Sequence, residues 1–81
     1  MVDETSRIFG ERLKQLMNEQ DYSFRKLEAT TGIPFNTLND YVNGKVAVPL
    51  ARAKIIADTF GESVDWMAGG TSIRLIKKIA N

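Results

Sequence analysis

The sequence contains neither cysteine nor histidine. Without cysteine the chain cannot form disulfides or thiolate metal sites, which excludes disulfide-rich secreted scaffolds and zinc fingers. Without histidine it lacks the usual general base, the Ser/His and Cys/His nucleophile pairs and imidazole metal ligands. We therefore expect a protein that is not an enzyme and that uses no cofactor, no metal and no small-molecule substrate.

Long apolar runs are also missing. Long uncharged stretches such as residues 29–39 and 46–51 contain Pro or Gly and are far shorter than the ~18 apolar residues of a membrane span. The chain begins Met1-Val2-Asp3-Glu4, which is acidic and is followed by no apolar segment, so a signal peptide is not expected. These features predict a cytoplasmic protein with no membrane partner.

A length of 81 residues, of which 43% are hydrophobic and 26% charged, suits one small domain. Eleven basic and ten acidic side chains give a net charge of +1, which by itself does not indicate a nucleic-acid partner. Residues 1–70 hold eight basic and ten acidic side chains, whereas residues 71–81 hold Arg74, Lys77, Lys78 and no acid. We therefore expect a domain over residues 1–70 and a basic tail over residues 71–81.

Apolar residues recur at helical spacing in short segments bounded by Gly or Pro, a pattern that predicts an all-α fold. The first helix is expected over residues 6–20, with Thr5 or Ser6 as its N-cap and a buried stripe of Phe9, Leu13, Leu16 and Met17. A later helix is expected to begin at Pro49 and to end at Gly61, with an apolar face of Leu50, Ala53, Ile56, Ala57 and Phe60. Ser63 is expected to cap a last core turn that contains Val64, Trp66 and Met67.

Two short helices joined through Gly32-Ile33-Pro34 are the most informative feature. Ser23 suits the N-cap of the first helix, and Gly32 suits a left-handed residue just past its end. Pro34 suits the first turn of the second helix, which Asn43-Gly44 would end. So short a turn forces a steep crossing, the geometry of a helix-turn-helix. The spacing buries Leu27, Ile33, Leu38 and Tyr41 beneath the turn and leaves Phe35, Asn36, Asn39 and Asp40 outside.

The segment Ser23–Gly44, SFRKLEATTGIPFNTLNDYVNG, resembles the helix-turn-helix of the lambda-repressor-like, Cro/CI (XRE-type) family, and in particular a phage or prophage repressor domain. Residues 9–16 resemble that family's first helix, and residues 55–61 and 64–67 resemble its fourth and fifth. The resemblance covers residues 6–69. It implies a compact five-helix DNA-binding domain, to which the tail would add a C-terminal helix.

Three positions depart from the family pattern. Phe24 stands where the family usually has Gln, whose side chain touches phosphate and braces the recognition helix, so that contact is not carried over. Glu28 occupies a position where the second helix packs on the third and a small residue is usual, so either the helices lie farther apart or Glu28 bends outward. Pro34 replaces a Ser or Thr cap and offers no side-chain oxygen.

The resemblance implies that residues 34–43 form a recognition helix. The positions that match base-contacting residues are Phe35, Asn36, Asn39 and Asp40. A phenyl ring can pack on a thymine methyl, an Asn amide can pair with adenine, and a carboxylate can accept from a cytosine amine. Phosphate contacts are expected from Ser23, Arg25, Lys26, Asn43 and Lys45.

Each of these residues also has a simpler interpretation. Phe35 could be a core aromatic, since apolar residues are buried more often than they contact DNA. Asp40 could serve only to exclude wrong sequences, because phosphates repel its carboxylate. The two asparagines and the three cations could be ordinary solvated side chains.

The favoured function is a sequence-specific double-stranded DNA-binding transcriptional regulator. The resemblance implies a repressor that binds a pseudo-palindromic operator as a homodimer. The alternative is a protein-interaction module of the same fold, antitoxin-like or adaptor, which the net charge of −2 over residues 1–70 keeps open.

Ile73, Ile76 and Ile79 form an apolar stripe at helical spacing in the tail. We expect this stripe to pair with a second protomer, because a chain of this size has little reason to expose it. The alternatives are that it folds back on Leu13 or Trp66 of its own chain, or that it begins a linker.

Overall fold

The computed structural model describes residues 3–70, and this part of the chain consists of five helices and no strands. The helices are α1 (Glu4–Glu19), α2 (Phe24–Thr31), α3 (Phe35–Val42), α4 (Leu50–Phe60) and α5 (Val64–Met67). Their order confirms the predicted all-α, five-helix fold. Among residues 3–70, no helix has both the length and the hydropathy that crossing a membrane requires. The tail, with the dimerisation residues predicted there, lies outside the described residues.

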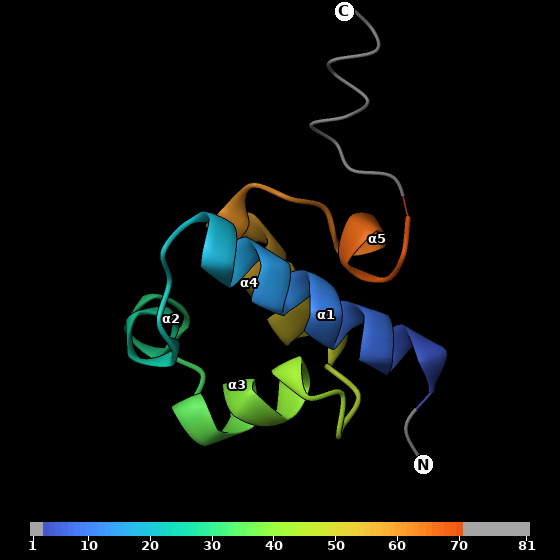
Figure 1. Cartoon of the computed structure of the whole chain (residues 1–81), viewed down its shortest axis with the longest axis horizontal. Coiled ribbons are helices and arrows are strands. Elements are labelled where there is room, and N and C mark those ends of the chain that lie inside the picture. The colour runs from blue at the N-terminus through green and yellow to red at the C-terminus, as the bar shows by residue number, and fades with distance from the viewer. Residues whose placement is uncertain (1–2, 71–81) are drawn as a thin grey trace, which may run out of the picture.

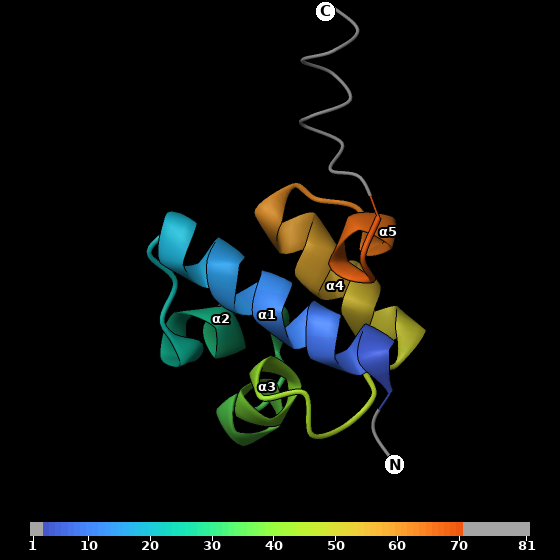
Figure 2. The same ribbon diagram turned by 45° about the vertical axis from the view of Figure 1, so that its right-hand side comes forward.

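Helix α1, the longest of these five helices, crosses the middle of the domain (Figure 1). It packs against α3 on one side and against α5 on the other. Helix α2 packs against α3 and α4, and α4 packs against α5 (Figure 2). The helix-turn-helix formed by α2 and α3 is therefore held by both long helices of the domain.

The core takes large side chains from all five helices. The largest fully buried side chains are Leu13, Leu16, Leu27, Leu38, Ile56 and Met67. The stripe predicted for α1 and the residues predicted beneath the turn, Ile33 and Tyr41 included, are all buried, as the sequence indicated. Each large apolar side chain in such a core contributes about 1.5–3 kcal/mol of transfer free energy.

The turn between α2 and α3 has the predicted left-handed glycine. Gly32 adopts a φ of 78° as the C-cap of α2, and its N–H donates to the Glu28 carbonyl over 2.8 Å. Ile33 then enters the core with 3% of its surface exposed. A side chain with a Cβ is strained at a positive φ, so Gly32 permits the tight turn that brings α3 beneath α2.

Three details of the sequence prediction are wrong. Asp3, rather than Thr5 or Ser6, caps α1, because its carboxylate is the acceptor nearest to the free N–H groups of the first turn. Pro34 is the N-cap of α3 and not a residue of its first turn, since its ψ of 142° is extended. Leu50 is 74% exposed because it lies at the edge of the α4 stripe, at the first residue of the helix.

Helices α1 and α3 approach each other closely at Gly10. A Cβ on Gly10 would lie 2.5 Å from the carbonyl oxygens of both Tyr41 and Val42. Those oxygens belong to the last turn of α3, so even one methyl group on α1 would push that turn outward. The absence of a side chain at Gly10 therefore sets the position of α3 on the domain.

Gly10→Ala is expected to destabilise the protein. Alanine normally favours a helix over glycine by about 1 kcal/mol, but overpacking typically costs about 1–3 kcal/mol, and here the methyl meets backbone atoms that cannot rotate away. The free energy of unfolding from urea titration would measure the change. Ala29→Gly, the reverse change at an exposed position of α2, should cost about 1 kcal/mol by propensity alone. A stabilising effect of Gly10→Ala would contradict the close packing.

The cap of α1 should make stability depend on pH. The backbone N–H of Ser6, with its hydroxyl, holds the pKa of Asp3 below its ordinary value of 3.8. A lowered folded-state pKa adds stability above the unfolded-state pKa, and this stability is lost as the pH falls through the folded-state value. Asp3→Asn keeps a good cap but does not titrate. Thermal melts in acid should therefore fall less steeply for Asp3→Asn than for the unmodified protein, and equal slopes would refute a role for the Asp3 charge.

Candidate nucleic-acid interface

Helix α3 turns one face to the core and the other to solvent. Leu38 and Tyr41 are buried, whereas Asn36 and Asn39 are exposed, as predicted. Phe35 is also exposed, with 37% of its surface accessible, so its interpretation as a core aromatic is wrong. Asp40 is half-buried and lies at the border of the two faces.

The N-terminus of α3 is capped from α2. Pro34 makes no side-chain cap hydrogen bond, and the Phe35 N–H instead donates to Oε2 of Glu28 over 3.2 Å. Glu28 is half-buried, so the carboxylate that replaces the usual small residue bends towards α3. A carboxylate at a helix N-terminus is also favoured by the helix dipole. Glu28 thus satisfies one of the free N–H groups at the start of α3.

Arg25 and Phe35 come into contact across the turn. The guanidinium carbon of Arg25 lies 4.9 Å from the centroid of the Phe35 ring, a distance at which a cation is attracted to the ring face. Both side chains are exposed. A residue predicted to contact phosphate and one predicted to contact a base are therefore neighbours.

The N-terminus of α2 presents a serine and a lysine. The hydroxyl of Ser23 accepts from the Lys26 N–H over 3.0 Å and so caps α2, as predicted. Its hydroxyl proton remains available as a donor. The Lys26 ammonium lies 4.5 Å from the centroid of the Tyr22 ring. Anions are favoured at such a helix N-terminus. Ser23 and Lys26, which are predicted to contact phosphate, both lie there.

At the other end of α3, backbone hydrogen bonds hold the turn that carries Lys45. The Lys45 N–H donates to the Asp40 carbonyl over 3.0 Å, and Gly44 adopts a φ of 66°. The Asn43 amide donates to Oδ1 of Asn39 over 3.4 Å, a long hydrogen bond by ordinary standards. Asn43 and Lys45 are exposed just after the C-terminal end of α3.

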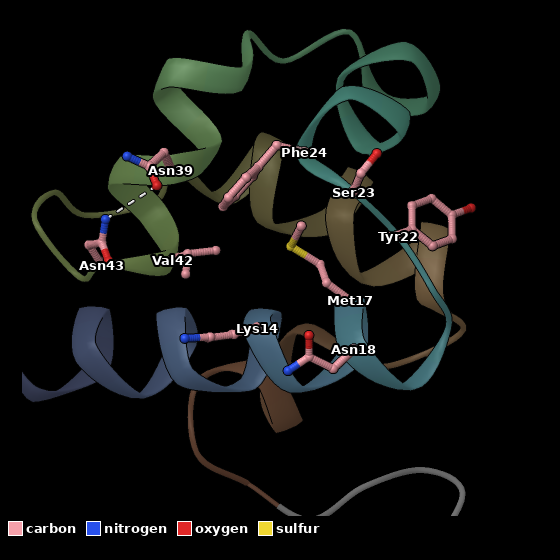
Figure 3. Close-up of a pocket in the computed structure, with 9 residues that line it drawn as sticks. All are labelled: Lys14, Met17, Asn18, Tyr22, Ser23, Phe24, Asn39, Val42 and Asn43. Carbon is pink, nitrogen blue, oxygen red and sulfur yellow. Dashed lines mark hydrogen bonds between the residues drawn. The ribbon is translucent and has the colours of Figure 1, made fainter.

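A groove of about 390 Å³ runs between α1, the start of α2 and the end of α3. Figure 3 shows Met17, Phe24 and Val42 pointing into it from the three helices. Phe24, where the family usually has Gln, is half-buried against the core. The groove brings together Ser23 and Asn43, which lie far apart in the sequence.

Two residues of α1, Lys14 and Asn18, also line this groove, and the sequence analysis did not assign them to the site. They are one helical turn apart, and both are exposed beside the buried stripe of α1. Residues four apart lie on the same face of a helix, so the sequence could have shown that Lys14 and Asn18 are neighbours. Their nearness to α3 depends on the contact between α1 and α3 and has no counterpart in the sequence.

The interface is locally basic although residues 1–70 carry a net charge of −2. Lys14, Arg25, Lys26 and Lys45 are exposed around α3. Of the acids near them, Glu28 is half-buried and already bonded to the Phe35 N–H, and Asp40 is half-buried. Asp3 and Glu4 line a hollow with Asn43 and Gly44, where Asp3 bonds to the Ser6 N–H and Glu4 pairs with Arg7. Within residues 3–70, no cluster of three carboxylates is placed to hold a metal ion.

A family model described as helix-turn-helix matches residues 13–67. No curated protein and no solved structure gave a significant match. The matched range begins in α1 and ends with the last residue of α5. It contains every residue of the interface described above.

Proposed function

Because the chain belongs to the XRE-type, Cro/CI-like helix-turn-helix family, a family of DNA-binding regulators, we propose that it represses transcription by binding one specific operator sequence. The exposed face of α3 would enter the major groove, whose width admits a helix. The N-terminus of α2 and the residues after α3 would hold the phosphates on either side. Repression would then come from occupying the operator and requires no chemical step.

The proposal rests on the exposure of Asn36 and on its lack of hydrogen-bond partners within the described part of the chain. Its side chain is exposed at the start of α3, and no hydrogen bond among residues 3–70 involves its amide. An amide with free donors and acceptors can pair bidentately with adenine N6 and N7. Asn39, one turn further along, is also exposed.

We propose further that two protomers bind a pseudo-palindromic site. A two-fold dimer places two recognition helices in successive major grooves, about 34–36 Å apart along the duplex. Ile73, Ile76 and Ile79 remain our candidates for the dimer contact.

The second candidate function is a protein-interaction module, antitoxin-like or adaptor. It is favoured by three apolar side chains exposed on α4 and the loop before it, Val46 at 42%, Leu50 at 74% and Ile55 at 44%. The DNA-binding proposal is preferred because it also accounts for the exposed amides and the cations around α3.

Selection from randomised duplexes should yield one half-site motif. The affinity of the protein for duplexes that contain this motif should fall as the salt concentration rises. Each neutralised phosphate contributes about −0.9 to the slope of log K against log salt, so three contacts on each of two protomers give roughly −5. Lys26→Ala should reduce this slope by about 1 for each protomer and weaken all sequences alike. Equal affinity for selected and scrambled duplexes would instead favour the protein-interaction module.

Asn36→Ala should relax the base preference at one position of each half-site. The loss of a bidentate amide contact costs about 1–3 kcal/mol of discrimination, whereas the melting temperature should barely change because the side chain is exposed. Binding to duplexes with each base at that position would measure the loss. Gln15→Ala, which removes an exposed amide of α1 outside the interface, is the control. If Asn36→Ala instead unfolds the domain, the recognition face has been misplaced.

A further inference from the structure

Arg25 is placed to read bases together with Phe35. Its guanidinium lies over the exposed Phe35 ring at 4.9 Å, at the end of α3 that follows the turn. We propose that Arg25 and Phe35 form one stacked unit that recognises a thymine beside a guanine, and that Glu28 positions it. This inference rests on the proposed DNA-binding function, and it changes the role of Arg25 from phosphate contact to specificity determinant.

The chemistry of the two side chains fits such a base step. A phenyl ring is an apolar surface for the thymine C5-methyl group, and a guanidinium can donate two parallel hydrogen bonds to guanine O6 and N7. Stacking on a ring covers one face of the guanidinium and leaves its N–H edges free. It also restricts a long side chain before DNA arrives, which reduces the entropy lost on binding.

Arg25 does not form the ion pair that its position on α2 would allow. Glu28 is three residues further along the same helix, a spacing that commonly forms an ion pair. Among residues 3–70, however, Arg25 takes part in no salt bridge, and the Glu28 carboxylate bonds to the Phe35 N–H at 3.2 Å. Both α2 side chains therefore converge on the first residue of α3.

Glu28 acts as a positioning residue. It accepts from the N–H of the first residue of α3, and it is half-buried. By holding the Phe35 backbone it sets where the ring, and hence the guanidinium above it, stands relative to the rest of α3. Glu28 itself is not expected to touch a base.

The decisive experiment compares Arg25→Lys with Lys26→Ala on a duplex panel in which each operator base pair is varied in turn. A phosphate contact needs only charge, so Lys would replace Arg25 with little change at any sequence. If Arg25 instead recognises a base while stacked on Phe35, it needs the planar guanidinium group that Lys lacks. Arg25→Lys should then lose roughly tenfold in base preference at one thymine-guanine step and little at other positions. Lys26→Ala should lower all affinities without changing any preference.

Phe35→Leu tests whether the two side chains act together. It keeps an apolar contact but removes the ring face, and the exposed position should leave the fold intact, which a thermal melt would check. If the two residues form one unit, the double variant Arg25→Lys, Phe35→Leu should lose little more preference than either single variant. Additive losses would overturn the stacked unit.

Glu28→Gln and Glu28→Ala test the positioning role. Both remove a negative charge near phosphate and should raise affinity for every sequence by a similar factor. Gln retains an acceptor oxygen for the Phe35 N–H, so it should keep the preference at the thymine-guanine step, whereas Ala should lower it. Equal preferences in the two variants would overturn the role of Glu28.

These outcomes separate the inference from the function on which it rests. If the unmodified protein selects an operator and Arg25→Lys keeps every base preference, the stacked unit is wrong and the DNA-binding function stands. If the unmodified protein selects no sequence, or binds a protein through this face instead, the proposed function fails and the stacked unit fails with it.

Discussion

The candidate DNA-binding surface depends on the close approach of α1 and α3 at Gly10. The last carbonyl groups of α3 lie where a Gly10 side chain would be, so α3 rests directly on the backbone of the longest helix. This contact holds the C-terminal end of α3 against α1. Leu38 and Tyr41 turn into the core, and the opposite face, with its two exposed asparagines, turns outward. It also creates the groove in which Lys14 of α1 lies near the end of α3.

The second constraint is the junction between α2 and α3. Gly32 permits the turn and Ile33 anchors it in the core, but the start of α3 would lack a side-chain cap without Glu28. A half-buried carboxylate at a helix crossing is costly unless it has hydrogen-bond partners, and here the free N–H of Phe35 provides one. A residue that looks unfavourable at the packing position is thus accommodated by a free N–H at the start of α3.

The sequence predicted much of the candidate site because its exposed face follows from helical period. Once Leu38 and Tyr41 are placed inside, Asn36 and Asn39 must lie outside, and the structure agrees. Helical periodicity could not show that Glu28 caps α3 or that Arg25 lies over the Phe35 ring. Nor could it show that Lys14 and Asn18 share a groove with Ser23 and Asn43. These contacts join different helices, and their geometry depends on how the helices cross.

The helices, their order and most of their ends could be predicted from the sequence, because they depend on local signals. Ser23, Ser63 and the left-handed Gly32 and Gly61 act within one or two turns of their own helices. Which exposed residues face one another depends on how the helices pack. Capping energies and helical period act between neighbours in the chain, whereas the contacts of Gly10 with α3 and of Glu28 with Phe35 exist only after the helices have packed.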